Sequence, residues 1–171
     1  MGEVRLPAGG LVAMRRAIEE SSDDAIRCLR EAGRRLAAET EAEILERVGL
    51  PLPALSLSRF WSELAAYFDE VGWGYVEHEE VNEGVGAVHA RDWAESDPEE
   101  SRPGPGCHIS TGLLAELLTR AAGQPVAVME VDCRSQGDER CRFLFGSPTT
   151  LLLVHRKLAE ETSLEDALAA I

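Results

Sequence analysis

Three of the four cysteines of this 171-residue chain lie in its last third, together with an acidic residue that interrupts an apolar run. Cys133 and Cys141 face each other across a predicted hairpin, and Cys107 stands at the start of a predicted helix, where the helix dipole favours a thiolate. Glu130 precedes Cys133 by three residues, and a carboxylate in a core needs a partner. Three thiolates and one carboxylate are suitable ligands for a tetrahedral zinc ion.

This spacing leaves alternatives open. Glu130 and Cys133 have opposite parity in a regular strand, so a shared metal requires a bulge or a strand end between them, near Asp132. Without a metal, Cys133 and Cys141 would be reduced core residues and Glu130 would face water. A disulfide between the two cysteines is a further alternative, which a reducing compartment disfavours.

The pattern of apolar residues predicts the elements that position these side chains. Helices are expected over 11–20, from the capping residues 21–24 to Gly49, over 58–71, over 107–122 and over 149–160, with a short one after Ser163. Strands over 74–79 and 85–93, and over 125–133 and 141–145, are expected to form two hairpins separated by an acidic loop at 94–106. This order indicates an α+β fold with helices on an antiparallel sheet. In the long second helix, Gly33 predicts a close helix crossing within an apolar stripe: Ile26, Leu29, Leu36, Thr40 and Ile44.

Length and charge exclude several classes of protein. A chain of 171 residues fits one domain, 1–171. The net charge of −14 disfavours binding to nucleic acid and to anionic membranes. No apolar run reaches the ~20 residues that span a bilayer, and the first ten residues are no secretory signal, so we expect a cytoplasmic protein.

The segment from Cys107 to Cys141 resembles the vinyl-4-reductase domain family. The family signature is a cysteine, a glycine-containing amphipathic helix, Gly-x-Pro before a strand, Glu-x-x-Cys and Gly-Asp-x-x-Cys. The matching residues here are Cys107, Gly112, Gly123-Gln-Pro125, Glu130-Val-Asp-Cys133 and Gly137-Asp-Glu-Arg-Cys141.

This resemblance implies the fold of the TRAPP vesicle-tethering subunits, in which helices pack on a twisted antiparallel sheet. It also implies a homodimer, with residues 1–20 as a dimerisation arm or helix. In the related sensor domains of phenol-responsive bacterial activators a zinc ion is held by three cysteines and a glutamate, at positions matching Cys107, Glu130, Cys133 and Cys141. Four protein ligands leave no open position for substrate, so this zinc is expected to be structural.

The same sensors predict where a small hydrophobic or aromatic ligand would bind. Their ligand-contacting tryptophan is most similar to Trp93, whose indole N–H is suited to a hydroxyl group, and the alternative is an aromatic residue at the edge of the core. His89 shares strand parity with Trp93, and Trp61 and Tyr67 are expected first in the core and second in the pocket lining.

We therefore expect a ligand-binding module, a sensor or carrier, that acts through a separate partner. The chain has no Gly-x-Gly-x-x-Gly fingerprint, no flavin signature and no evident acid–base pair, which argues against an enzyme. The alternatives are a reductase or accessory protein in the vinyl reduction of bacteriochlorophyll synthesis, and a non-catalytic scaffold.

Overall fold

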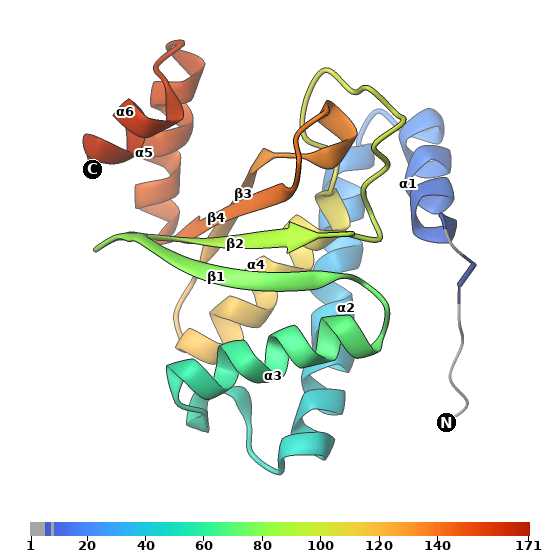
Figure 1. Ribbon diagram of the computed structural model, residues 1–171, viewed down its shortest axis with the longest axis vertical. Helices are drawn as coiled ribbons and strands as arrows, with labels where there is room; N and C mark the ends of the chain where they lie inside the picture. Colours follow the sequence, from blue (N-terminus) through green and yellow to red (C-terminus); the bar gives the residue numbers. More distant parts are fainter. Residues whose placement is uncertain (1–5, 8) are drawn as a thin grey trace.

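The computed structural model describes residues 6–7 and 9–171 (Figure 1). Within them the elements follow in this order: α1 (Gly10–Ser21), α2 (Ala25–Val48), the short 3₁₀ helix η1 (Leu52–Ala54), α3 (Leu57–Glu70), β1 (Tyr75–Asn82), β2 (Val85–Arg91), α4 (His108–Ala122), β3 (Ala127–Asp132), the short η2 (Arg134–Gln136), β4 (Cys141–Gly146), α5 (Pro148–Ala159) and α6 (Leu164–Ala169). The predicted sequence of helices and hairpins is confirmed. None of the helices described is long and apolar enough to cross a membrane.

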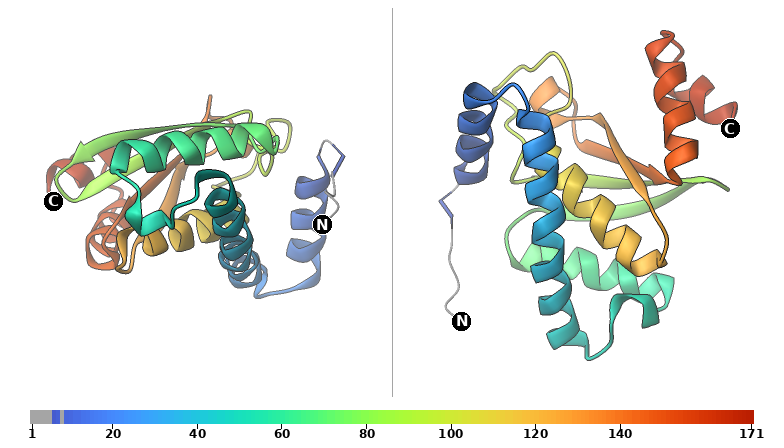
Figure 2. Two further views of the ribbon diagram at one scale, coloured as in Figure 1. Left: turned by 90° about the horizontal axis from the view of Figure 1, so that it is seen from below. Right: turned by 180° about the vertical axis from the view of Figure 1, so that it is seen from behind.

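The strands of the described chain form one antiparallel sheet in the order β1-β2-β4-β3. Helices α2, α3 and α4 cover one face, and α5 and α6 pack on the other face at one end (Figures 1 and 2). This arrangement confirms the predicted α+β class.

Alternation along the strands divides the apolar side chains between two cores. Val88 of β2 and its partner Phe143 of β4 pack against the α2–α4 layer. Their neighbours Ala87 and Leu144 point to the opposite face and pack against α5 and α6. The first core holds three of the four cysteines (Cys107, Cys133 and Cys141) and the tryptophans, so both predicted sites depend on the α2–α4 layer.

The predicted close crossing at Gly33 is confirmed, and its partner is α4. A Cβ atom at Gly33 would collide with the backbone of α4, and one at Gly112 of α4 would collide with the backbone of α2. The buried stripe of α2 differs from the expected one, because Ile26 and Leu36 are 51% and 40% exposed. Small side chains are required where the two helices cross at Gly33, and the buried stripe is Ala25, Leu29, Gly33, Ala37, Thr40 and Ile44.

Helix α1 lies beside the loop that leads from β2 to α4 (Figure 1). Arg15 of α1 is fully buried and forms ion pairs with Glu19 and with Glu100 of the loop. Arg102 of the loop also forms an ion pair with Glu19 of α1, with 2.8 Å between its guanidinium nitrogen and the carboxylate oxygen. Burying Arg15 requires such pairing, so α1 is attached to the loop mainly through charge. Residues 1–5 and 8 of the predicted dimerisation arm lie outside the described residues.

Candidate metal centre

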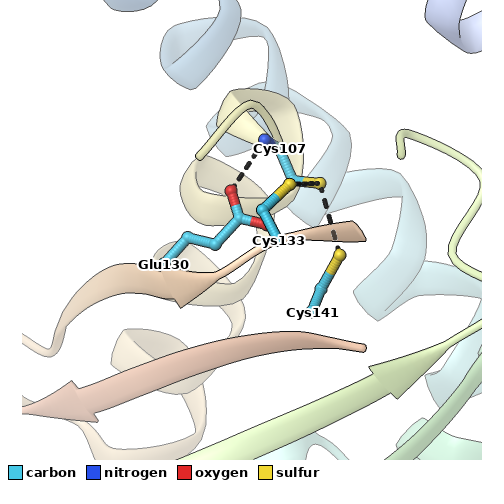
Figure 3. Close-up of side chains that lie close together, drawn as sticks. All are labelled: Cys107, Glu130, Cys133 and Cys141. Carbon is cyan, nitrogen blue, oxygen red and sulfur yellow. Dashed lines mark hydrogen bonds between the residues drawn. The ribbon is translucent and has the colours of Figure 1, made fainter. Parts of the chain in front are cut away.

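The cysteine and glutamate side chains predicted to bind zinc meet in the α2–α4 core (Figure 3). Cys107 comes from the residue before α4, Glu130 and Cys133 from β3 and its end, and Cys141 from the start of β4. One ligand atom from each residue lies within 4.8 Å of the other three. The Sγ atom of Cys107 is 3.8 Å from those of both Cys133 and Cys141.

A bulge at the end of β3 makes this convergence possible. The register of β3 against β4 shifts between Glu130 and Asp132, as the shared site requires. Beyond it, the backbone N–H of Cys133 donates to Asp138 at 2.7 Å, and η2 turns the chain toward Cys141. Glu130 and Cys133 therefore reach one point despite their opposite parity.

The structure excludes two of the alternatives left open by the spacing. The cysteines are free, so the disulfide alternative does not hold. Glu130 is only 9% exposed and does not face water.

Glu130 is only partly satisfied by the protein. Its Oε2 accepts a hydrogen bond from the backbone N–H of Cys107 at 2.8 Å (Figure 3). Its Oε1 is buried and has no hydrogen-bond partner among the described residues. A buried polar atom without a partner is costly, and one carboxylate oxygen of Glu130 lies within 4.8 Å of the three sulfur atoms. The donor set therefore fits a thiophilic divalent cation such as zinc.

The crowding of these acids shifts their pKa values. Hydrogen bonds from Cys107 and Cys141 lower the pKa of the Cys133 thiol. Hydrogen bonding to Cys133 and Cys141, followed by burial, raises the pKa of the Cys107 thiol. Burial, followed by the charge of Cys133, raises the pKa of Glu130 to about 9. A cation would displace the protons that the cluster retains and would stabilise its anionic form.

A second buried carboxylate binds the same helix end. Glu95 is fully buried and accepts hydrogen bonds from the backbone N–H groups of Ile109 and Ser110 at 2.8 and 2.7 Å. The Ser110 hydroxyl also donates to Glu95, at 2.5 Å. Burial raises the pKa of Glu95 to about 7, although these hydrogen bonds act in the opposite direction. Glu95 thus caps the first turn of α4 from the loop.

Trp93 is bound to this cap. It is 1% exposed, and its indole N–H donates to the Ser110 hydroxyl at 2.7 Å. Its ring packs edge-on against Phe68, with centroids 5.2 Å apart. The capping roles of Ser110 and Glu95 were not predicted from the sequence. The sequence feature that could have indicated these roles is an acidic residue in the loop before the helix and a hydroxyl residue in its first turn.

The other predicted ligand-binding residues do not gather around Trp93. Trp61 is buried and stacks on His78, with centroids 4.7 Å apart. Tyr67 is half-buried, and its hydroxyl lies 3.5 Å from that of Thr40. The aromatic neighbours of Trp61 are Phe60, His78 and Phe145, whereas those of Trp93 are Phe68, Trp73 and Phe143.

His89 lies on the opposite face of the sheet from Trp93, so the prediction that the two side chains share an orientation is wrong. Strand β2 ends at Arg91, and Asp92 takes a positive φ of 49° that turns the chain before Trp93. His89 remains on the α5 face, where its Nε2 lies 2.7 Å from the Glu79 carboxylate. Trp93 enters the α2–α4 core instead.

Comparisons with known proteins agree with this architecture. The fold is similar to that of the phenol-responsive sensory domain of the transcription activator PoxR, in its crystal structure with phenol (TM-score 0.70, 16% identity, covering 85% of this chain and 76% of that one). It is also similar to a vinyl-4-reductase family protein from Methanocaldococcus jannaschii (TM-score 0.53, 20% identity, 85% and 82% covered). A third similar structure is a trafficking protein particle complex subunit 3 from Naegleria fowleri, covalently bound to palmitic acid (TM-score 0.59, 12% identity, 81% and 91% covered).

At the level of sequence, no curated protein matches the chain. Residues 94–147, which contain all four predicted metal ligands, match the family model of the V4R domain. The predicted resemblance to the vinyl-4-reductase family, and to the fold that it shares with TRAPP subunits, is thereby confirmed.

Proposed function

We propose that this protein is a zinc-stabilised module that binds a small hydrophobic or aromatic molecule and acts through a separate partner. The observation that carries the proposal is the buried cluster of Cys107, Glu130, Cys133 and Cys141, with its unpaired Glu130 oxygen. It lies within the matched V4R segment of a chain whose fold resembles a phenol-responsive sensory domain. Homodimerisation and a cytoplasmic location remain predictions from the sequence.

Zinc would have a structural role at this site. Four protein ligands complete a tetrahedron and leave no position for water or substrate. The ligands come from the start of α4, the end of β3 and the start of β4, so one ion would join three elements. Closed sites of this kind contribute roughly 10–16 kcal/mol, which is comparable to the stability of a whole domain.

The ligand would bind next to Trp93. Its indole N–H is bonded to Ser110, in the first turn of the helix that follows Cys107. A ligand hydroxyl that takes the place of Ser110 would therefore also change the contacts of Glu95 with α4. Ligand binding would thus be coupled, through Ser110 and Glu95, to the end of α4 at which the metal would bind.

Titration with phenol, followed by tryptophan fluorescence and calorimetry, tests the ligand part of the proposal. We expect saturable binding that weakens at least tenfold in Trp93→Phe, because phenylalanine lacks the N–H group. Binding should tighten in Ser110→Ala, which releases that N–H from its internal partner.

Ser96→Ala is the matched control, since the Ser96 hydroxyl donates to the backbone oxygen of Trp93 and not to its ring. It should leave the affinity unchanged. Binding that is absent from the wild-type protein, or equal in all four proteins, would contradict a phenol-type ligand at Trp93.

One observation favours a second function, that of a non-catalytic scaffold. Trp93 is 1% exposed and packs between Phe68, Trp73 and Phe143, so the protein's own side chains surround the predicted ligand contact. A scaffold would bind a protein partner with or without phenol, whereas a sensor would change its partner affinity when phenol is added.

A further inference from the structure

A groove of about 580 Å³ lies where α3 meets β1, the strand at one edge of the sheet. Helix α3 contributes Ala65, Ala66 and Asp69 to its lining, and β1 contributes Tyr75 and Glu77. The two alanines are small, so the helix leaves space beside the strand. The groove lies outside the metal centre and shares none of its residues.

Strand β1 is suited to pairing with a further strand. Over its eight residues, Tyr75–Asn82, it pairs with β2 on one side, and it is the terminal strand in the order of the described sheet. The outer edge of such a strand presents backbone N–H and C=O groups that an extended peptide can bind. The groove beside residues 75–77, at the start of this strand, can accept side chains of the added peptide.

The charge of the groove defines the chemistry of the occupant. Three carboxylates line it, from Asp69, Glu77 and Asp92; Arg91 binds Glu77 at 2.7 Å, and Arg134 lies 3.6 Å from Asp92. Tyr75 is 56% exposed and presents an aromatic ring at the same place. Carboxylates and an aromatic ring together attract arginine and lysine side chains.

The same charges disfavour a second copy of this chain at the edge. Besides Glu77, β1 carries exposed Glu79 and Glu80. Pairing two such strands would place glutamates opposite or diagonal to one another, and like charges across a strand pair are destabilising. A partner of opposite charge avoids this repulsion.

We propose that the edge of β1 and the groove beside α3 form a docking site for an extended, arginine- or lysine-rich segment of a partner protein. The segment adds a strand to the sheet, and its basic side chains meet Asp69, Glu77 and Tyr75. This inference goes beyond the proposed ligand-binding function, since it requires neither the metal nor phenol.

The test uses the full chain and two fluorescein-labelled eight-residue peptides, one of alternating arginine and valine and one of alternating glutamate and valine. We expect the basic peptide to bind saturably by fluorescence anisotropy and the acidic peptide not to bind. Hydrogen–deuterium exchange should show new protection of the amides in residues 75–82. No saturable binding, or binding without that protection, would overturn the proposal.

Two variants change the groove in different ways. Ala66→Trp fills it without altering charge, and Asp69→Asn combined with Glu77→Gln removes charge without altering shape. Each should weaken peptide binding at least tenfold, with thermal unfolding used to verify that the variants are folded.

The matched control is Glu39→Gln combined with Glu46→Gln, which removes two exposed charges from α2. It should change the affinity less than twofold. An equal loss in this control, or full binding by Ala66→Trp, would show attraction to the overall charge and would overturn the site. Analytical ultracentrifugation tests self-association. If the wild type self-associates and Ala66→Trp does not, the groove binds a second copy of this chain and the proposal is overturned.

Discussion

Two buried carboxylates bind the same end of α4, and they differ in how completely the protein satisfies them. Glu95 accepts hydrogen bonds from Ile109 and Ser110 through both of its oxygens. Glu130 accepts one from Cys107 through Oε2, and its Oε1 has no partner within the described chain. Burial raises the pKa of each, to about 7 for Glu95 and about 9 for Glu130.

The difference separates a structural carboxylate from a ligand. A carboxylate that caps a helix needs only N–H and O–H donors, and the first turn of a helix supplies them. A buried carboxyl group that keeps one oxygen unpaired beside three thiols either retains its proton, as the raised pKa of Glu130 indicates, or binds a cation that displaces the proton. We therefore assign Glu95 to the fold and propose Glu130 as a metal ligand.

Metal removal should have the largest effect. Because a closed zinc site contributes roughly 10–16 kcal/mol, a strong chelator should abolish cooperative unfolding of the domain. Thermal unfolding followed by circular dichroism, with and without the chelator, measures this. Restoration by added zinc is the control, and an unchanged melting temperature in the chelator would contradict a structural metal.

Exchange of each carboxylate for its amide sharpens the comparison. Glu130→Gln keeps an oxygen for the Cys107 N–H but loses the charged ligand, so the zinc affinity should fall at least 100-fold. Glu95→Gln should leave the affinity within about threefold, because Glu95 is not among the predicted ligands. Competition with a chromophoric chelator gives both values. Equal losses of zinc affinity in the two variants would contradict the different roles given to Glu95 and Glu130.

The raised pKa of Glu95 should make the stability of the folded protein depend on pH. Its pKa in the folded protein, about 7, lies above the ordinary value of 4.5, so the folded state binds more protons between these values. Stability from this group is therefore fully present below pH 4.5 and is lost as the pH rises to 7, by an amount on the order of 3 kcal/mol.

Denaturant unfolding of wild type and Glu95→Gln between pH 4.5 and 8 measures the effect. The stability of the wild type relative to the variant should fall with rising pH over this range. A relative stability that is flat or rises with pH would show that Glu95 stays ionised in the fold.

Loss of the Ser110 hydroxyl should have the smallest effect. Ser110→Ala removes one of the hydrogen bonds to Glu95 and leaves the Trp93 N–H unpaired, at a cost of about 1–3 kcal/mol. Zinc content should stay unchanged, because Ser110 belongs to the Glu95 cap. A loss of metal along with stability would indicate that the two carboxylates act as one unit.

The convergence of Cys107, Glu130, Cys133 and Cys141 was predictable from their residue types together with the resemblance to the vinyl-4-reductase family. Three cysteines and an acid in an apolar strand have few uses, and the required bulge near Asp132 could be deduced from parity alone. The close crossing at Gly33 followed in the same way, from a residue that weakens a helix unless packing requires it.

The remaining features depend on tertiary contacts that leave no pattern in the sequence. The orientation of Trp93 depends on the positive φ of Asp92, and no glycine marks this position. The cap formed by Glu95 joins residues 14 and 15 positions apart, across a loop without periodicity. Leu36 satisfied the helical period, yet the close contact with α4 selected Ala37 instead.

The central claim, that Glu130 and the cysteines form a metal centre, is tested most directly by elemental mass spectrometry on protein purified without a metal-binding tag. We expect about one zinc per chain, retained in Glu95→Gln and lost in Cys133→Ser. A metal-free wild-type protein that is folded and has titratable thiols at Cys107, Cys133 and Cys141 would contradict the claim.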